Sequence, residues 1–419
     1  MSPSTSSPGR HLVFFERAGD ARAAFHRAAA GGEEYYHGER RTVTLKRELA
    51  ERFGRATVIT ATGAESWDEG LTPHLRAVGL GCGHTSFEPA AKAWLNAHPP
   101  THLIVGPEPG VLEWAAGRTP RVEVLPNFAH TFFNPASGPN PLVRLRRGLL
   151  ARRERRRFAA TLRRLDPALL LNHNQVAAED LRRLAPRPER VSAFEVIDET
   201  PLDRARERTL PESGPLRVFF CGRTDPDKGL PELIHACGTL AKERYEVRLV
   251  VCGGGDEAAA RALATAAGLS DGLDWRGPSP RSEVLRQLEL ATIAAVPSWP
   301  SCPEGLPLTL MEPLGMGVPV VASNHRVWAR LREDEEVVRH RGSRPAGVAD
   351  ALRRVLADPA LYARLSRNGP DAFRRLRSAE MLADAHRRWA DAVLGPAAAT
   401  DAGLLKHPGS RAADDARAA

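Results

Sequence analysis

The chain has 419 residues, 42% of them hydrophobic and 26% charged, proportions that are ordinary for a soluble globular protein. This length exceeds what one hydrophobic core usually serves, so we expect two domains. The net charge is +8, but 54 of the 59 basic residues are arginine, a skew that indicates genome composition rather than a binding surface. We therefore expect no nucleic-acid partner.

Cysteine usage and the lengths of the apolar runs bear on the compartment. The five cysteines form no C-x-x-C pair, which is typical of a reduced protein without disulfides or a zinc knuckle. Residues 1–10 contain no apolar signal segment and are expected to be disordered. No run reaches the roughly 18 apolar residues of a membrane span. These features predict a cytoplasmic protein.

The first half of the chain alternates short apolar runs with helical patterns. This alternation is typical of a domain with a parallel sheet, which we expect over residues 11–200. The clearest helix is expected at residues 42–53. Strands are expected at residues 11–15, 56–60, 102–106, 122–126, 168–172 and 191–196.

Residues 144–165 form an arginine-rich segment with ten arginines and one glutamate. Apolar residues recur in it at helical intervals, namely Leu145, Leu149, Phe158, Leu162 and Leu165. The pattern predicts a basic amphipathic helix. Such a helix either packs on the domain with a solvated basic face or lies on an anionic membrane as a peripheral contact.

A polar, proline-bearing stretch at 201–214 predicts a linker. Alternation then resumes over an expected second domain at 215–360, followed by helices at 361–395 that pack back toward the first domain. Residues 396–419 are small, polar and aperiodic, which predicts a disordered tail. Strands of the second domain are expected at residues 216–222, 247–254, 273–277, 292–298 and 318–323.

Two doubly wound domains facing each other bring the carboxyl ends of both sheets to one cleft, where open α/β sheets bind ligands. One loop at such a place is CGRTDPDKGL, residues 221–230. Gly222 lets the backbone turn, and Arg223 and Lys228 supply two cations that suit a diphosphate. A charged surface hairpin is the other interpretation. Lys228 favours the diphosphate, because lysine is rare in this chain.

The second informative stretch is PEGLPLTLMEPLGMGVPVVAS, residues 303–323. A helix is expected to begin near Pro307 or Leu308, because proline is favourable in the first turn. The free amides of Leu308 and Thr309 would then form an anion site.

Two glutamates flank the start of this predicted helix. Glu312, one turn into it, can accept both hydroxyls of a ribose, and Glu304 can accept hydroxyls of a transferred sugar. Alternatively, both glutamates only favour the dipole at the helix N-terminus. Pro313 predicts a later helix start or a kink, because proline inside a helix removes a hydrogen bond.

In this order the motifs resemble the nucleotide-binding half of retaining GT-B glycosyltransferases of the family 4 type, also described as glycosyl transferases group 1. That family carries a G-R-x(4)-K-G loop, then an E-x(7)-E motif that runs into G-x-P-V-V-A. The three elements are found here at 222–229, 304–312 and 317–322. The resemblance implies the GT-B fold, two doubly wound Rossmann-like domains facing across a cleft.

The resemblance also assigns roles to individual residues. It implies that Arg223 and Lys228 hold the donor diphosphate and that Glu312 and Glu304 hold the ribose and the donor sugar. It places the base near Arg276 and Gly277.

The N-terminal half resembles the family less sharply. Its acceptor-binding domain would bring Gly31 and Gly32 to the diphosphate from the opposite wall. His130, just past a predicted strand, corresponds to a histidine that the family often has near the donor sugar. The implied catalytic set is therefore His130, Arg223, Lys228 and Glu304.

We expect a hexosyltransferase-type enzyme that moves a sugar from a nucleoside-diphosphate donor to the hydroxyl of an acceptor. The sequence leaves open whether the acceptor is a small molecule, a glycan or a lipid-linked molecule. A nucleotide-sugar epimerase, a phosphorylase or a catalytically silent partner subunit with the same fold remain alternatives.

No metal and no cofactor are expected. Asp225 and Asp227 form a D-x-D triplet of the kind that chelates hard divalent ions. The triplet lies between Arg223 and Lys228, whose charges already serve a diphosphate. A plain turn is the favoured interpretation.

Overall fold

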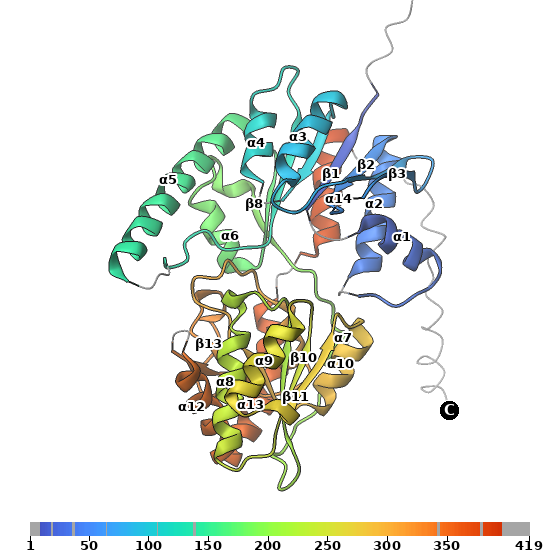
Figure 1. Ribbon diagram of the computed structural model, residues 1–419. Coiled ribbons are helices and arrows are strands. Elements are labelled where there is room, and N and C mark those ends of the chain that lie inside the picture. The colour runs from blue at the N-terminus through green and yellow to red at the C-terminus, as the bar shows by residue number, and fades with distance from the viewer. Residues whose placement is uncertain are drawn as a thin grey trace, which may run out of the picture.

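The computed structural model describes residues 9–17, 20–35, 38–63, 65–106, 108–136, 140–341, 344–377 and 380–395. Most of the expected disordered N-terminus, and the whole of the expected tail at 396–419, lie outside these described residues. Within them the chain forms two α/β domains, one above the other in Figure 1, each built around its own sheet. The expected pair of doubly wound domains is confirmed.

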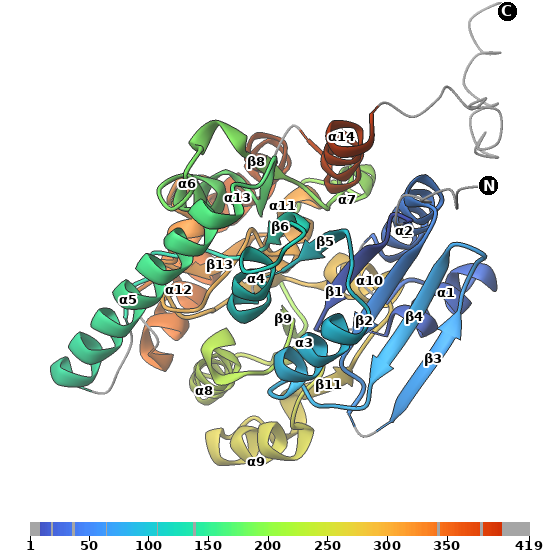
Figure 2. The ribbon, with the colours of Figure 1, turned by 90° about the horizontal axis from the view of Figure 1, so that it is seen from above.

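The N-terminal domain contains an eight-stranded sheet in the order β3-β4-β2-β1-β5-β6-β7-β8, in which β3 alone is antiparallel to its neighbour. The six predicted strands are confirmed, with ends that differ by at most two residues. The structure adds β3 and β4, which form an edge hairpin (Figure 2). The strands are β1 Leu12–Glu16, β2 Ala56–Thr60, β3 Ser66–Gly70, β4 Leu75–Leu80, β5 His102–Val105, β6 Glu123–Phe128, β7 Leu170–His173 and β8 Val191–Phe194.

Helices cover both faces of this sheet. Alternate residues of β1 point to opposite faces, as strand geometry requires. Leu12 and Phe14 join one hydrophobic core, and Val13 and Phe15 join the other. The helices are α1 Ala21–Ala29, α2 Glu39–Phe53, α3 Phe87–Ala97, α4 Pro109–Ala116, α5 Pro141–Leu165 and α6 Gln175–Arg182.

The C-terminal domain contains a six-stranded parallel sheet in the order β11-β10-β9-β12-β13-β14. Its five predicted strands are confirmed, and the three-residue edge strand β14 is additional. The strands are β9 Leu216–Cys221, β10 Val247–Cys252, β11 Leu273–Gly277, β12 Ile293–Val296, β13 Val320–Ser323 and β14 Val338–His340. The helices are α7 Thr200–Asp203, α8 Leu230–Lys242, α9 Glu257–Ala267, α10 Arg281–Leu290, α11 Leu308–Gly315, α12 Pro345–Ala357 and α13 Pro359–Leu376.

The chain passes between the domains twice. The segment after β8 leads into the C-terminal domain, and α14 (Leu382–Leu394) returns to the N-terminal one, as its position among α2 and the N-terminal strands in Figure 1 shows. The two passages are hydrogen-bonded to each other, because the Glu195 amide donates to the Glu380 carbonyl and the Leu382 amide donates to the Glu195 carbonyl, both at 2.9 Å.

The predicted helical region at 361–395 is thus two helices with different partners. Helix α13 packs on α11 so closely that a Cβ added at Gly369 would lie 2.7 Å from the Leu314 carbonyl oxygen. Helix α14 packs on α2, where the Trp389 ring stacks on Phe53 with centroids 5.7 Å apart. The expected return to the N-terminal domain therefore applies to α14, whereas α13 belongs to the C-terminal domain.

The arginine-rich segment is helical, as predicted, but its apolar residues do not share one environment. Leu162 and Leu165 are buried at the end of α5, whereas Leu145 and Leu149 are exposed. Packing on the domain therefore accounts only for the last turns of this helix. Among the described residues, no helix combines the length and apolar composition needed to cross a membrane.

Replacing Trp389 by alanine should lower the free energy of unfolding of the N-terminal domain by about 3–5 kcal/mol, the usual cost of deleting a buried indole. Trp389 is fully buried, so its truncation to alanine leaves a cavity inside the core. Urea unfolding followed by circular dichroism measures the change. Trp389→Phe should recover most of the loss, and equal stabilities of all three proteins would show that α14 does not stabilise the domain.

Candidate functional site

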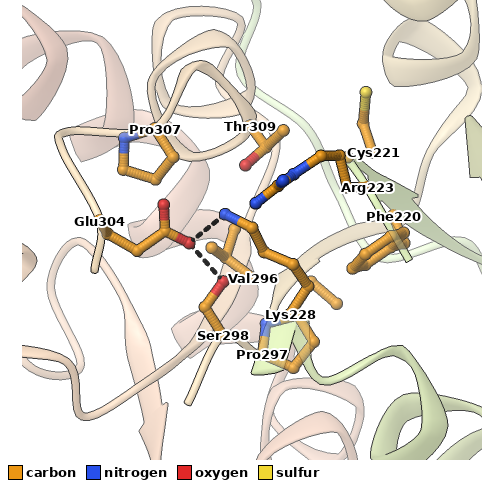
Figure 3. A pocket seen from close by; sticks show the side chains of 12 residues that line it. Phe220, Cys221, Arg223, Lys228, Val296, Pro297, Ser298, Glu304, Pro307 and Thr309 are labelled. Carbon is orange, nitrogen blue, oxygen red and sulfur yellow. Dashed lines mark hydrogen bonds and ion pairs between the residues drawn. The ribbon is translucent and has the colours of Figure 1, made fainter. Parts of the chain in front are cut away.

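A cavity of about 130 Å³ lies at the carboxyl ends of β9 and β12, in front of the N-terminus of α11 (Figure 3). The loop after β9 supplies one wall, and the segment from the end of β12 to α11 supplies the other. The cavity is lined by Phe220, Cys221, Gly222, Arg223, Lys228, Ala295, Val296, Pro297, Ser298, Glu304, Pro307 and Thr309. Five of the predicted site residues are therefore brought together.

Gly229 fixes the loop that carries Lys228. Its φ of 77° lies in the left-handed region, and a Cβ there would come within 2.3 Å of the Pro297 carbonyl oxygen. Only glycine allows this close approach. The Trp299 amide also donates to the Asp227 carbonyl at 2.7 Å, which holds the loop against the end of β12.

The centre of the cavity is an ion pair between Lys228 and Glu304. The Lys228 Nζ lies 2.6 Å from Glu304 Oε1, and their side chains are only 19% and 8% exposed. The hydroxyl of Ser298 donates to the same oxygen at 2.8 Å. Both bonds are drawn in Figure 3. A buried carboxylate requires such partners, because an unpaired buried charge is costly.

Arg223 lies at the rim rather than inside. Its side chain is 75% exposed and pairs with Asp225 at 3.2 Å, which leaves the guanidinium in contact with solvent. The cavity therefore has one enclosed cation, Lys228, and one largely exposed cation, Arg223.

Helix α11 begins at Leu308, directly after Pro307, as predicted. Thr309 lines the cavity, whereas Leu308 does not appear among the lining residues. Pro313 lies inside the helix, beyond its first turn, so the later start that this proline suggested is wrong. The amides of Leu310 and Met311 already donate to the Pro307 carbonyl, so the first two amides of the helix are those available to a ligand.

Glu312 is buried behind the cavity. Its Oε1 lies 3.3 Å from the Nε of Arg281, and the Nη2 of Arg281 lies 3.7 Å from Oδ1 of Asp198. Burial raises the pKa of Glu312 to about 7, even though Arg281 opposes the shift. Arg281 was missed from the sequence, because nothing in its own helix indicates that it faces a glutamate 31 residues away.

The other predicted donor contacts lie away from the cavity. The side chain of Arg276 pairs with Asp274 at 2.7 Å, and Gly277 ends β11 with a φ of 66°. The carbonyls of Gly31 and Gly32 accept hydrogen bonds from Arg40.

The loop that follows these two glycines crosses to the C-terminal domain. The Arg281 amide donates to the Glu34 carbonyl at 2.9 Å, and the Ser282 hydroxyl donates to Glu33 at the same distance. The loop thus meets the segment that holds Arg281, and through it Glu312, rather than the Lys228 cavity.

His130 follows β6 and packs against the rings of Phe128 and Phe132, with centroids 5.9 and 4.7 Å away. Burial lowers the pKa of His130 to about 4, so its imidazole is neutral at pH 7. The next residue, Thr131, donates its amide to the Glu304 carbonyl at 3.1 Å. The loop that carries His130 is therefore hydrogen-bonded to the loop that carries Glu304.

A second histidine, His173, packs against the loop that carries Glu304. A Cβ at Gly305 would lie 2.9 Å from His173 Nδ1, and the other ring nitrogen lies 3.0 Å from Glu195. Burial would raise the pKa of Glu195, but hydrogen bonds from His173 and from two backbone amides hold it below its usual value. Hydrophobic periodicity does not show this dyad, because both residues lie at ends of otherwise apolar strands.

Asp180 joins the two domains beside this loop. It is fully buried, accepts the amides of Phe132 and Phe133 at 2.9 and 3.2 Å, and forms a two-pronged ion pair with Arg326 of the C-terminal domain. Its position in the middle of α6 gave no signal in the sequence.

Two doubly wound α/β domains facing each other are the architecture of the GT-B fold. HepE of Anabaena, solved in complex with UDP-glucose, superposes with a TM-score of 0.57 at 16% identity, over 91% of this chain and 99% of that one. Residues 203–372 match the family described as glycosyl transferases group 1.

Curated relatives match a part of this chain. The amylovoran biosynthesis glycosyltransferase AmsK of Erwinia amylovora is 34% identical over 149 residues, 34% of this chain and 35% of that protein. The D-inositol 3-phosphate glycosyltransferase of Corynebacterium glutamicum is 34% identical over 190 residues, 42% and 44% of the two chains. The chain thus spans less than half the length of the curated relatives that it matches.

Replacing Glu312 by glutamine should change how stability depends on pH. The folded carboxyl keeps its proton up to about pH 7, whereas the unfolded chain loses it near the ordinary value of 4.5. The stability that this group contributes is therefore full below pH 4.5 and is lost as the pH rises through 7, by about 3 kcal/mol in total.

Thermal or urea unfolding of both proteins at pH 5 and pH 8 measures this effect. The wild type should lose stability relative to Glu312→Gln as the pH rises, since glutamine cannot ionise. Parallel curves would mean that Arg281 keeps Glu312 charged in the folded protein.

Proposed function

We propose that this chain is a glycosyltransferase that moves a hexosyl group from a nucleoside-diphosphate donor to an acceptor hydroxyl, with retention of anomeric configuration. The observation that carries the proposal is the enclosed pair of Lys228 and Glu304 at the carboxyl ends of β9 and β12. The family match over residues 203–372 and the UDP-glucose bound by the similar HepE structure support it.

The cations supply the diphosphate end of the site. An ammonium has three hydrogens to donate, and Glu304 takes one of those on Lys228, so two remain for an anion in the cavity. Arg223 at the mouth and the amides at the start of α11 add positive potential. Transfer breaks the bond between the anomeric carbon and the diphosphate oxygen, and these groups stabilise the charge that grows there.

The two carboxylates, Glu304 and Glu312, are assigned to the hydroxyls of the donor sugar and of the ribose. Lys228 and Ser298 both bond to Oε1 of Glu304, and Oε2 is the oxygen that we assign to hydroxyls of the donor sugar. We assign the ribose hydroxyls to Glu312, which would share its acceptor oxygens between the diol and Arg281.

The remaining predicted contacts complete the proposal. Because His130 is neutral, it would serve the donor sugar as a hydrogen-bonding group rather than as a cation. Arg276 and Gly277 would border the base at the end of β11. Gly31 and Gly32 precede the crossing loop that meets Arg281, which is consistent with a wall over the nucleotide.

Lys228→Ala should cut sugar transfer by roughly 100-fold or more, because the leaving diphosphate loses its enclosed charge partner. Purified protein is incubated with a panel of nucleoside-diphosphate sugars, and donor hydrolysis and transfer are followed by release of the nucleoside diphosphate. Lys228→Arg should retain part of the activity. Lys242→Ala is the matched control, since Lys242 is an exposed lysine at the end of α8.

The outcomes separate the proposal from its alternatives. An epimerised donor without nucleotide release would indicate an epimerase, and phosphate-dependent cleavage of a glycoside would indicate a phosphorylase. Donor binding without turnover of any donor would indicate a silent partner subunit. Unchanged transfer in Lys228→Ala would remove this lysine from the chemistry.

Metal independence is part of the proposal. Asp225 forms an ion pair with Arg223. The backbone carbonyl of Asp227 accepts a hydrogen bond from the Trp299 amide. Transfer should therefore persist in excess EDTA, and the double variant Asp225→Asn/Asp227→Asn should lose less than about tenfold in turnover, as expected for a turn rather than a metal site. Loss of turnover on chelation, with restoration by Mn²⁺, would overturn this assignment.

A further inference from the structure

Helix α5 extends well beyond the sheet that it belongs to (Figures 1 and 2). It has 25 residues, but its buried residues are only Thr161, Leu162 and Leu165, all in the last two turns. The first four turns carry large apolar side chains into solvent. Leu142, Leu145 and Leu149 are 77%, 62% and 59% exposed. In the part of the chain that the structure describes, nothing covers them.

The exposed leucines occupy a different face from the packed ones. At 3.6 residues per turn, Leu142, Leu145 and Leu149 lie along one stripe, and Phe158, Leu162 and Leu165 lie about half a turn away around the axis. The second stripe packs on the domain, where Phe158 stacks on Phe132. The outer stripe is therefore not an extension of the core contact.

Arginines continue the outer stripe. Arg146, Arg153 and Arg156 fall at the same helical intervals as Leu142 and Leu149, and all of them are exposed. The helix as a whole has ten arginines and one glutamate. The same face thus carries leucine side chains at one end and a dense positive charge along its length.

We infer that this outer face of α5 is a docking surface for an anionic lipid bilayer. Leucines inserted at the boundary between headgroups and acyl chains, with arginines among the anionic headgroups, are the combination by which an amphipathic helix binds in the plane of a membrane. The inference goes beyond the proposed function and does not depend on it.

Charge decides against the other occupants. A second copy of this face would bring Arg146, Arg153 and Arg156 against the same three arginines, and three leucines bury too little area to offset that repulsion. A nucleic acid would satisfy the arginines but would leave the leucine stripe in water.

The test is sedimentation of the full chain with vesicles. Phosphatidylcholine vesicles containing about 30% phosphatidylglycerol should carry the protein into the pellet at low salt, and raising the salt should weaken the binding. Vesicles of phosphatidylcholine alone should leave it in the supernatant.

Two variants divide the contributions. Arg146→Gln/Arg153→Gln/Arg156→Gln should weaken binding to the anionic vesicles by on the order of 100-fold, since each arginine near such a surface contributes substantially. Leu145→Ser/Leu149→Ser should weaken it by roughly tenfold or more, because the inserted apolar area is lost.

Matched controls keep the charge and composition comparable. Arg47→Gln/Arg261→Gln/Arg374→Gln removes the same charge from exposed helix faces elsewhere, and Leu290→Ser removes a leucine that is 49% exposed on α10. Both controls should bind as the wild type does.

Three results would overturn the inference. The first is wild-type protein that stays in the supernatant with anionic vesicles, and the second is equal binding by the α5 variants and their controls. The third is a change of oligomeric state in the leucine variant, measured by light scattering, without any change in vesicle binding. That last result would make the stripe an interface between copies of the chain.

Discussion

The site depends on one enclosed ion pair between side chains 76 residues apart. Lys228 and Glu304 are largely removed from water, and each lowers the cost of burying the other's charge. The requirement fixes the two loops that carry them, because the glycine after Lys228 must touch Pro297 and the serine that follows β12 must reach Glu304. The two charges are thus held in place by contacts within the C-terminal domain.

The N-terminal domain is fitted to this pair through backbone contacts. The Thr131 amide donates to the Glu304 carbonyl, and the Asn134 side chain donates to the Cys302 carbonyl at 2.9 Å. Gly305 leaves no room for a side chain between them and His173. The loop that holds the catalytic candidate Glu304 is therefore shared between the domains, so its shape depends on how closely they approach each other.

Much of this structure could be predicted from hydrophobic patterns and short sequence motifs. Apolar runs predicted eleven strands, and the spacing of Gly222, Arg223, Lys228 and Glu304 predicted a set that the structure does bring to one cavity. The features that these patterns missed depend on contacts between residues far apart in the sequence. The hairpin strand β3 is polar and exposed, so it has no periodic signature, and the partner of Glu312 comes from another helix. The prediction of one amphipathic face on α5 was wrong, because at 3.6 residues per turn Leu145 and Leu149 lie about half a turn from Leu162 and Leu165. Spacing alone also does not say where this helix stops touching its domain.

The second passage between the domains has a consequence for how the chain is made. The core of the N-terminal domain includes Ala385, Trp389 and Ala390, which are synthesised after the whole C-terminal domain. During synthesis the first 200 residues therefore expose the surface of α2 that Trp389 later covers. Domains commonly fold in order from the N-terminus. Here the first domain can close its core only after the second has left the ribosome, so the order of completion is reversed.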